Sequence, residues 1–413
     1  MRAPGARRAR WRGVPVGMRD LVAADVAQRR RVESRLTDTF SRWGYAEVAT
    51  PTLEYLDTLV HGTGPAAGDR LLKLVDSGGE VLALRPEMTV PIARLAATRL
   101  LPAAGAGPLR LSYLCSVFRG QERGSGMARE FTQAGVELLG DASAYADAEM
   151  IGLAGAALRS AGIVEPVIAI GHAGFLRGVL AGLPPAVSDT VRDLLYRRAF
   201  ADLESELPAG AALAVLQLLP TLRGEDALVR ARRLTTAAES REALDALEEV
   251  AGLARRYDDG VRIEVDLAQI RDFDYYTGVI FEAHAPQSGV PLLGGGRYDN
   301  LLERFGYAAP ATGFAIGVEY VLAAQPGEPA EPVPIVIVFQ PGKHVDAVRA
   351  AARLRGAGLA VVMAAAGAQP HADVCVITTE AADRFEVRRD GVLVGCALDD
   401  LVGTVRDARR PPA

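Results

Sequence analysis

Glu87 and Thr89 are the first residues whose types and spacing could do chemistry, and they lie two positions apart in the segment ALRPEMT. On a strand the two side chains would share one face, because side chains alternate across a strand. A carboxylate beside a hydroxyl suits an ammonium group. Taken alone, the pair also fits the solvated face of an ordinary strand.

A second acid lies in SVFRGQERGSGMAREFTQAGVELLG, which has the pattern of a long hairpin. Arg119 ends the first strand, and a loop with three glycines follows it. On the returning strand, Gln133 and Glu137 share a face with Gly135 by period two. A carboxylate in such a pocket can accept an imidazole N–H. Exposed strand residues are the alternative interpretation.

Tyrosines and glycines come together farther along the chain. IRDFDYYTG has Arg271 before Tyr275 and Tyr276, and LLGGGRYDNLL has three consecutive glycines before Tyr298. Glycine allows the backbone to approach a ligand closely. A run of glycines is more often a turn, however, so this segment is weak evidence by itself.

The elements that would position these residues form a main body from Val14 to about Ala324. Strand-like segments such as RLSYLCSVFR and YTGVIFEAH flank a block at about 161–257, which is rich in Ala, Leu, Glu and Arg with helical periodicity. A strand-rich body interrupted by helices predicts an α+β domain with a helical insertion.

A second, smaller domain follows a linker. QPGEPAEPVP, at 325–334, contains four prolines, which exclude a helix and favour an extended connection. The apolar run PIVIVF, a helix ending near Gly358, and the runs LAVVM and ADVCVITT predict strand, helix and further strands. We therefore expect a small α/β domain at 335–413.

Composition limits the classes of protein. The 413 residues are 49% hydrophobic and 23% charged, which is typical of soluble globular proteins, and no apolar run is long enough to cross a bilayer. The basic segment 1–13 has no apolar core after it, so we expect a disordered tail and no signal peptide. Three cysteines without a CxxC motif indicate a cytoplasmic protein, and five scattered histidines predict no metal or other cofactor.

The segments, in this order, resemble the class II aminoacyl-tRNA synthetases, specifically the histidyl type, over nearly the whole main body. FSRWGYAEVATPTLE resembles motif 1, SVFRGQERGSGMAREF motif 2, and GFAIGVEYVL motif 3. RDFDYYTG and GGGRYDNL resemble the two histidine-specific motifs. The resemblance implies an antiparallel sheet with a helical insertion, followed by an anticodon-binding-like domain, and a homodimer formed around Pro51.

The resemblance also assigns roles to single residues on the histidine side of the pocket. Glu87 and Thr89 match the positions that hold the α-amino group, and Gln133 and Glu137 match the strand that contacts histidine, with Glu137 facing the imidazole. The remaining matches are the motif 2 arginine, the histidine-specific arginine and the tyrosines that line the pocket, namely Arg119, Arg271, Tyr275, Tyr276 and Tyr298.

The ATP side departs from the family. Motif 3 of the synthetases has a phosphate-binding arginine after its glutamate, whereas Tyr320 follows Glu319 here. Gln121 stands where motif 2 has a glutamate, although a register shift could bring in Glu122. Met127 aligns with a phosphate-reaching arginine, although Arg123 and Arg129 are near. Hydrogen bonds to charged groups contribute roughly 1.5–3 kcal/mol each. Losing two arginines would thus cost about 3–6 kcal/mol, or roughly 10²- to 10⁴-fold in rate.

The tail also departs from the family. A helix of the anticodon-binding-like domain is missing after GAQPHADVC, and from Pro334 to Ala413 ten basic residues meet nine acidic ones. With a net charge of -5 for the whole chain, this balance does not favour tRNA binding.

A pocket that fits histidine but lacks the residues to activate it is a sensor. In this respect the chain resembles the regulatory subunits of ATP phosphoribosyltransferase. Those subunits form hetero-oligomers with a short-form catalytic subunit and give it feedback inhibition by histidine. The resemblance implies a hetero-octamer. One alternative is an active histidyl-tRNA synthetase, which the presence of Arg119 and Arg271 supports. The other is a different histidine-binding paralogue.

We expect the purified chain to give no histidine-dependent exchange of pyrophosphate into ATP, because Tyr320 cannot neutralise phosphate charge. The exchange of labelled pyrophosphate measures this, with a working histidyl-tRNA synthetase as positive control. Robust exchange would identify the chain as an active synthetase.

Overall fold

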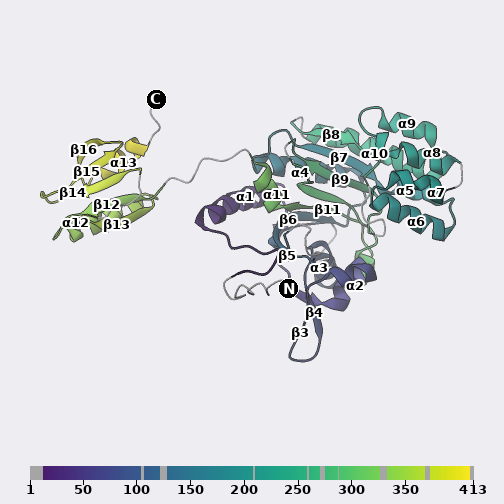
Figure 1. Ribbon diagram of the computed structural model, residues 1–413, viewed down its shortest axis with the longest axis horizontal. Coiled ribbons are helices and arrows are strands. Elements are labelled where there is room, and N and C mark those ends of the chain that lie inside the picture. The colour runs from purple at the N-terminus through teal and green to yellow at the C-terminus, as the bar shows by residue number, and fades with distance from the viewer. Residues whose placement is uncertain are drawn as a thin grey trace, which may run out of the picture. The chain divides into compact units, whose positions relative to one another are not determined.

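The computed structural model describes residues 13–103, 107–120, 128–207, 210–257, 260–269, 275–286, 288–325, 333–367 and 373–409 (Figure 1). It divides into two compact units, Met1–Glu328 and Pro329–Ala413. The predicted α+β class, with a large sheet, a helical insertion and a small C-terminal α/β unit, is confirmed. The predicted basic tail and five residues singled out above lie outside the described residues: Gln121, Glu122, Arg123, Met127 and Arg271.

An eight-stranded sheet organises the first unit. Its strands follow the order β1 (Ala46–Glu47), β5 (Leu109–Phe118), β6 (Glu130–Leu139), β11 (Ala311–Gly317), β10 (Leu293–Arg297), β9 (Val279–His284), β7 (Val167–His172) and β8 (Arg262–Val265). The two outermost pairs are parallel and all inner pairs are antiparallel. The predicted hairpin is β5 and β6, paired over their full length.

Helices cover one face of this sheet. They are α1 (Ala23–Arg42), α4 (Ala144–Ser160), α10 (Ala238–Tyr257) and α11 (Val318–Ala324). On α1, Leu36 and Phe40 are one turn apart and fully buried, and they join Val136 and Leu138 of β6 in the main core. Since side chains alternate along β6, the other face receives its polar residues.

A second, smaller core lies against the opposite face, at the end formed by β5 and β6. It is built from α2 (Leu56–Thr63), α3 (Thr89–Leu95), the helical turns Pro65–Arg70, Ala96–Leu100 and Leu302–Phe305, and a small sheet of β2 (Leu53–Tyr55), β4 (Val81–Leu84) and β3 (Lys73–Val75). Leu59, Met88 and Ile92 are its fully buried centre. This core supports one side of the pocket described below.

The helical insertion lies between β7 and β8 and contains α5 (Ala173–Leu180), α6 (Pro185–Tyr196), α7 (Leu203–Glu206), α8 (Ala211–Leu218), α9 (Ala227–Leu234) and α10, with short turns at Phe200–Asp202 and Leu219–Thr221. The predicted range of about 161–257 begins too early, because residues 167–172 form β7. The six residues of β7 include an apolar run of only four, which is too short to distinguish a strand from a buried helix by periodicity.

The second unit has the strand order β13 (Val361–Ala365), β12 (Ile335–Phe339), β14 (Cys375–Thr378), β15 (Arg384–Arg389) and β16 (Val392–Ala397), with helices α12 (His344–Gly356) and α13 (Leu401–Arg409). The β15–β16 hairpin and α13 follow the predicted strands and were not predicted. No helix in the described part of the chain is both long and apolar enough to cross a membrane.

Candidate functional site

The face of the large sheet opposite α1, α4, α10 and α11 carries a row of polar and glycine residues. The pairing of neighbouring strands brings Glu137 of β6 beside Gly313 of β11, and Gly313 beside Gly296 of β10. The adjacent row joins Tyr113 of β5 to Gly135. Gln133, Gly135 and Glu137 therefore share one face, as period two predicts.

Glycines on neighbouring strands let these side chains lie flat against the sheet. A Cβ atom on Gly313 would overlap the Glu137 carboxylate, and one on Gly135 would overlap the Tyr113 hydroxyl. A Cβ atom on Gly296 would lie 2.8 Å from the ring of Tyr276. The glycine run therefore does not form a turn, as glycine runs more often do, but lies within β10, where the absent side chains leave room for functional ones.

Glu137 belongs to this candidate site, which is called the pocket below, and is only 1% exposed. The Tyr298 hydroxyl donates a hydrogen bond to its Oε2 atom. The pKa of Glu137 is raised to about 8, mainly by burial. Hydrogen bonds from Tyr298 and Thr89 lower this pKa, and the charge of Glu87 contributes to the rise. Near neutral pH this carboxyl group can thus either donate or accept a hydrogen bond.

The secondary structure that holds Glu87 and Thr89 in the pocket differs from the predicted strand. They are not on a strand: β4 ends at Leu84, and Thr89 begins α3. The Glu87 carboxylate accepts hydrogen bonds from the backbone N–H groups of Thr89, at 2.5 Å, and Val90, at 3.0 Å. A carboxylate is favoured there because the first N–H groups of a helix lack partners within it. The α3 N-terminus, rather than strand alternation, brings the two residues together.

Arg119 follows β5 and lies against the turn that holds Glu87. Its Nε donates to the Pro86 carbonyl at 3.2 Å, and its guanidinium lies 4.9 Å above the Phe131 ring. Burial raises the pKa of Glu87, and its hydrogen bonds and the charge of Arg119 oppose that rise. Arg119 therefore provides positive charge at the end of the pocket where Glu87 lies.

The ring of Tyr320 packs against Phe131, the same ring over which the Arg119 guanidinium lies. The two rings are 6.2 Å apart at 35°, and a Cβ atom on Gly317 would overlap the Tyr320 ring. Glu319 accepts a hydrogen bond from the Thr132 N–H at 2.8 Å, which fixes the β11–α11 junction to β6. Both residues lie in the first turn of α11, directly after β11.

Three tyrosines form one wall of the pocket. Tyr275 stacks on Tyr298 with ring centroids 5.4 Å apart, and Tyr276 meets Tyr275 edge-on at 5.0 Å. Burial raises the pKa of Tyr275 and of Tyr298, so both phenols remain neutral hydroxyl groups. The wall is thus an uncharged aromatic surface with a hydroxyl group directed at Glu137.

Arg297 fixes this wall to the sheet. It is 7% exposed and bonds Asp147 of α4 at 2.9 Å and Asp299 at 3.1 Å, so the residues on both sides of Tyr298 are held. Losing one member of such a buried pair leaves an uncompensated charge. Arg297 belongs to the GGGRYDNL segment, and its role is to position Tyr298.

Sequence reasoning missed Tyr113, which belongs to the pocket. Its ring is almost fully buried, and both Glu137 and Glu87 raise the pKa of its hydroxyl in addition to burial. Its hydroxyl and the Gln133 Oε1 atom are buried without a hydrogen-bond partner among the residues that the structure describes. Buried polar atoms in proteins are nearly always hydrogen-bonded. The same period-two argument that selected Gln133 would have found Tyr113 on the partner strand.

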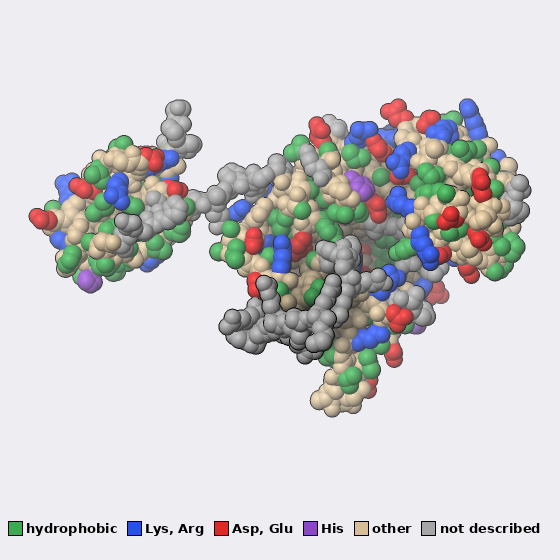
Figure 2. All heavy atoms as spheres, in the orientation of Figure 1, with side chains coloured by type: hydrophobic (Ala, Val, Ile, Leu, Met, Phe, Trp, Pro, Cys, Tyr) green, Lys and Arg blue, Asp and Glu red, His purple; other side chains and the backbone are tan. Residues whose placement is uncertain are grey.

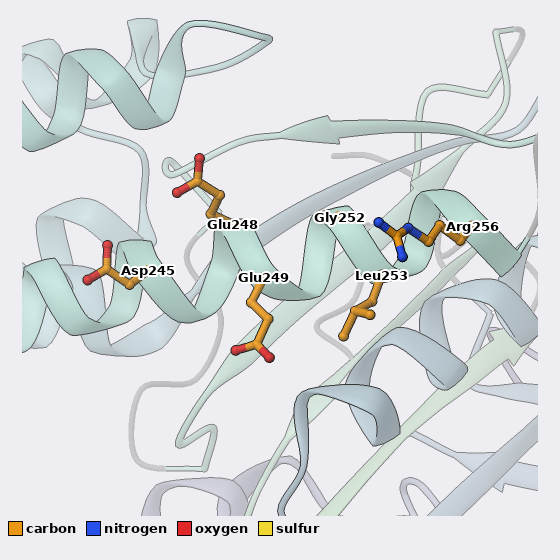
Figure 3. A pocket seen from close by; sticks show the side chains of 6 residues that line it. All are labelled: Asp245, Glu248, Glu249, Gly252, Leu253 and Arg256. Atoms are coloured by element: carbon orange, nitrogen blue, oxygen red, sulfur yellow. The ribbon is translucent and has the colours of Figure 1, made fainter.

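A more open hollow lies elsewhere, along α10 (Figure 3). Asp245, Glu248, Glu249 and Arg256 line it, and Figure 3 shows their side chains spread along the helix surface. Arg232 of α9 already pairs with Asp245 and Glu248. These paired, exposed charges describe a solvated groove, so the pocket around Glu137 is the better candidate.

Comparison with known proteins gives matches over most of the chain. The histidyl-tRNA synthetase family model matches residues 17–321. The ATP phosphoribosyltransferase regulatory subunit of Moorella thermoacetica is 41% identical over 363 residues, which is 85% of this chain and 91% of the relative. The Symbiobacterium thermophilum protein of the same name is 40% identical, over 84% of this chain and 90% of its own.

Solved structures agree in fold. The Bacillus halodurans protein described as an ATP phosphoribosyltransferase regulatory subunit/histidyl-tRNA synthetase has a TM-score of 0.79 and 34% identity, covering 89% of this chain and 98% of its own. Histidyl-tRNA synthetase from a Nostoc species has a TM-score of 0.78 at 20% identity, covering 96% and 99%. The second likeness concerns the fold alone.

The raised pKa of Glu137 predicts a pH-dependent effect on stability. Between the ordinary value of 4.5 and about 8, the folded state binds a proton that the unfolded state has lost, so rising pH destabilises the fold in this window. We expect Glu137→Gln to remove this loss, which is at most about 5 kcal/mol at roughly 1.4 kcal/mol per pKa unit. The Tm of the variant relative to wild type should rise from pH 5 to pH 8.5. Exposed Glu225→Gln is the control, and parallel Tm curves for Glu137→Gln and wild type would contradict the burial argument.

Proposed function

Since this chain belongs to the histidyl-tRNA synthetase family and, within it, to the ATP phosphoribosyltransferase regulatory subunits, we propose that it activates a short-form catalytic subunit and transmits feedback inhibition by histidine to it. The chain is the regulatory, non-catalytic subunit of that enzyme, which acts in histidine biosynthesis. The proposal concerns what it senses and how it acts on its partner. The single observation that carries it is the cluster of buried, unpartnered polar atoms around Glu137.

Histidine fits the pocket group by group. Its α-amino group would bind Glu87 and Thr89, which meet at the α3 N-terminus. Its α-carboxylate would then lie toward Arg119, on the same turn. The negative Glu87 and the positive Arg119 at one end of the pocket match the two charges of a zwitterion. Each charged group of the ligand would then have a partner of opposite charge in place of water.

The imidazole ring would occupy the other end, between Glu137 and the tyrosine wall. Imidazole has one N–H donor and one ring nitrogen acceptor when neutral. Glu137 can accept from the N–H group, while Tyr113 can donate its unpartnered hydroxyl hydrogen to the ring nitrogen. Gln133 offers a further acceptor, and Tyr275, Tyr276 and Tyr298 supply the flat apolar surface. Arg271, the histidine-specific arginine of the family, completes the proposed set.

Tyr320 argues against the alternative function, an active histidyl-tRNA synthetase. Its phenol brings no positive charge to the place where the family binds nucleotide phosphates, and its ring packs between Gly317 and Phe131. Preorganised charge around the phosphoryl groups is the main source of rate in such reactions. We therefore propose that the chain binds histidine without activating it.

The charge distribution supports a protein partner rather than tRNA. Figure 2 shows acidic and basic side chains interspersed over the helical insertion, without a broad basic patch on the face in view. In the second unit the acidic and basic residues nearly balance. Nucleic-acid binding depends on many arginine and lysine contacts to phosphate. The proposed assembly is a hetero-oligomer with the catalytic subunit, a hetero-octamer by family resemblance.

We expect Glu137→Ala to weaken histidine inhibition of the reconstituted enzyme about 10- to 100-fold, since a hydrogen bond to a charged group is worth roughly 1.5–3 kcal/mol. Glu87→Ala should act similarly through the α-amino group. The assay mixes this chain with a short-form catalytic subunit and measures phosphoribosyl transfer at increasing histidine, with Glu225→Ala as an exposed control. Normal inhibition of both variants would refute the residue assignment, and an unchanged partner rate with wild type would refute the regulatory function.

The proposed homodimer core uses the surface that follows Pro51. On the small sheet, Tyr55 pairs with Leu82 and Leu82 with Leu74, so these three side chains share a face. Tyr55 is 58% exposed and Leu74 is 37% exposed. Exposed apolar sheet surface of this kind is typical of protein interfaces.

We expect Tyr55→Asp to shift the chain from dimer to monomer at micromolar concentration, because the interface would bury an unpaired charge. Light scattering measures the mass. Tyr196→Asp, at a residue of matched exposure on α6, is the control and should remain dimeric. A wild-type chain that is already monomeric would refute the dimer.

A further inference from the structure

Thr277 connects the three tyrosines of the pocket wall. It follows Tyr275 and Tyr276 directly in the chain. Its backbone N–H donates to the Arg297 carbonyl at 2.8 Å, and its hydroxyl accepts from the Asp299 N–H at 3.0 Å. Tyr298 lies between Arg297 and Asp299, so a displacement of Thr277 would move the backbone on both sides of it. The position of Thr277 therefore sets the position of the whole wall.

Arg177 holds Thr277 from the other side, from the helical insertion. Its guanidinium donates to the Thr277 carbonyl at 3.1 Å and to the Glu239 carboxylate at 2.5 Å. The next carbonyl, that of Gly278, accepts from the Ala173 N–H at the start of α5 at 2.9 Å. Whereas Arg297 fixes the wall to the sheet, Arg177 fixes it to α5 and α10.

An arginine suits this position because its planar guanidinium can donate to two acceptors in fixed directions, which the single ammonium group of lysine cannot do equally well. Glu239 lies in the first turn of α10, where a carboxylate is favoured by the helix N-terminus. The 20 residues of α10 extend about 30 Å at 1.5 Å per residue. A change at the wall can thus reach the exposed acidic surface of α10 in Figure 3.

We propose that Arg177 is a positioning residue that couples the helical insertion to the tyrosine wall, so that histidine binding and the placement of α10 depend on each other. This inference rests on the proposed function for the identity of the ligand. Coupling between two sites is reciprocal, because each state that one site favours must change the affinity at the other. Among the described residues, the hydrogen bonds of Arg177 go to Glu239 and to the Thr277 carbonyl, so Arg177 would act on the wall through Thr277.

The test uses the full-length chain and three variants. Arg177→Lys keeps a positive charge for Glu239 but loses the second, fixed donor to Thr277. Glu239→Gln keeps an acceptor for the arginine Nε atom. Arg232→Lys is the matched control, since Arg232 also pairs with α10, at Asp245 and Glu248, but forms no hydrogen bond with the described residues of the wall. Hydrogen exchange at the Thr277 and Asp299 amides is measured without ligand, and histidine affinity by calorimetry.

We expect Arg177→Lys to speed exchange at both amides and to weaken histidine affinity about five- to tenfold, at the low end of measured couplings. Tm should stay unchanged, because Arg177 is 40% exposed. Glu239→Gln should change affinity by less than about threefold on the same scale, and Arg232→Lys should match wild type. Unchanged exchange in Arg177→Lys, an unchanged affinity, or equal effects of Arg232→Lys would overturn the inference. A wild-type chain that does not bind histidine would refute the proposed function instead, and the exchange data would still decide whether Arg177 positions the wall.

Discussion

The burial of the Glu137 carboxyl is the constraint on which the rest of the pocket depends. In the described part of the chain, no lysine or arginine forms an ion pair with it, and it is almost without exposure. A carboxylate in such a place is costly unless hydrogen bonds replace water. Tyr298 supplies one of them, Gly313 leaves the space for it, and Arg297 holds Tyr298 in position. A ligand with an N–H group at this point would stabilise the charged form, which an apolar ligand could not.

Regulation requires that the filled and empty pockets differ in structure or in stability elsewhere. A ligand shifts an equilibrium only by the difference in its affinity for the two states. The tyrosine wall is the part of the pocket best suited to differ, because Thr277 is held by two separate groups, one on the sheet and one on the helical insertion. The acid end, by contrast, is built into the α3 N-terminus and the end of β5, which belong to one packed core. One fold thus combines a fixed recognition end with an end that the insertion can influence.

Much of this arrangement could be predicted from the sequence, because strand alternation is a local property. Gln133 and Glu137 were assigned to one face on period two alone, and the hairpin that carries them was evident. A spacing of two residues predicts that Glu87 and Thr89 share the face of a strand. In the structure they lie instead in a turn and at the start of α3, a geometry that strand alternation does not describe. A run of glycines is more often a turn than a strand, and the residues that pack against the β10 glycines are distant in sequence, so the sequence alone does not reveal their place in a strand. Tyr113 could also be found by alternation, because it pairs with Gly135 on the predicted hairpin and shares the face of Gln133 and Glu137. The ligand-binding roles of all these residues stay predictions, and Arg271 and Met127 also lie outside the described residues.

The central claim is that this pocket recognises histidine through the hydrogen bonds of its ring. Calorimetric titration of the chain with histidine and, separately, with phenylalanine tests it most directly, because phenylalanine has a flat ring of similar size without nitrogen atoms. Sites built to hydrogen-bond a ligand reject analogues that lack the bonding group by on the order of 10⁴-fold or more. We expect one histidine to bind per chain and phenylalanine to show no measurable binding. Equal affinity for the two amino acids, or no binding of histidine, would contradict it.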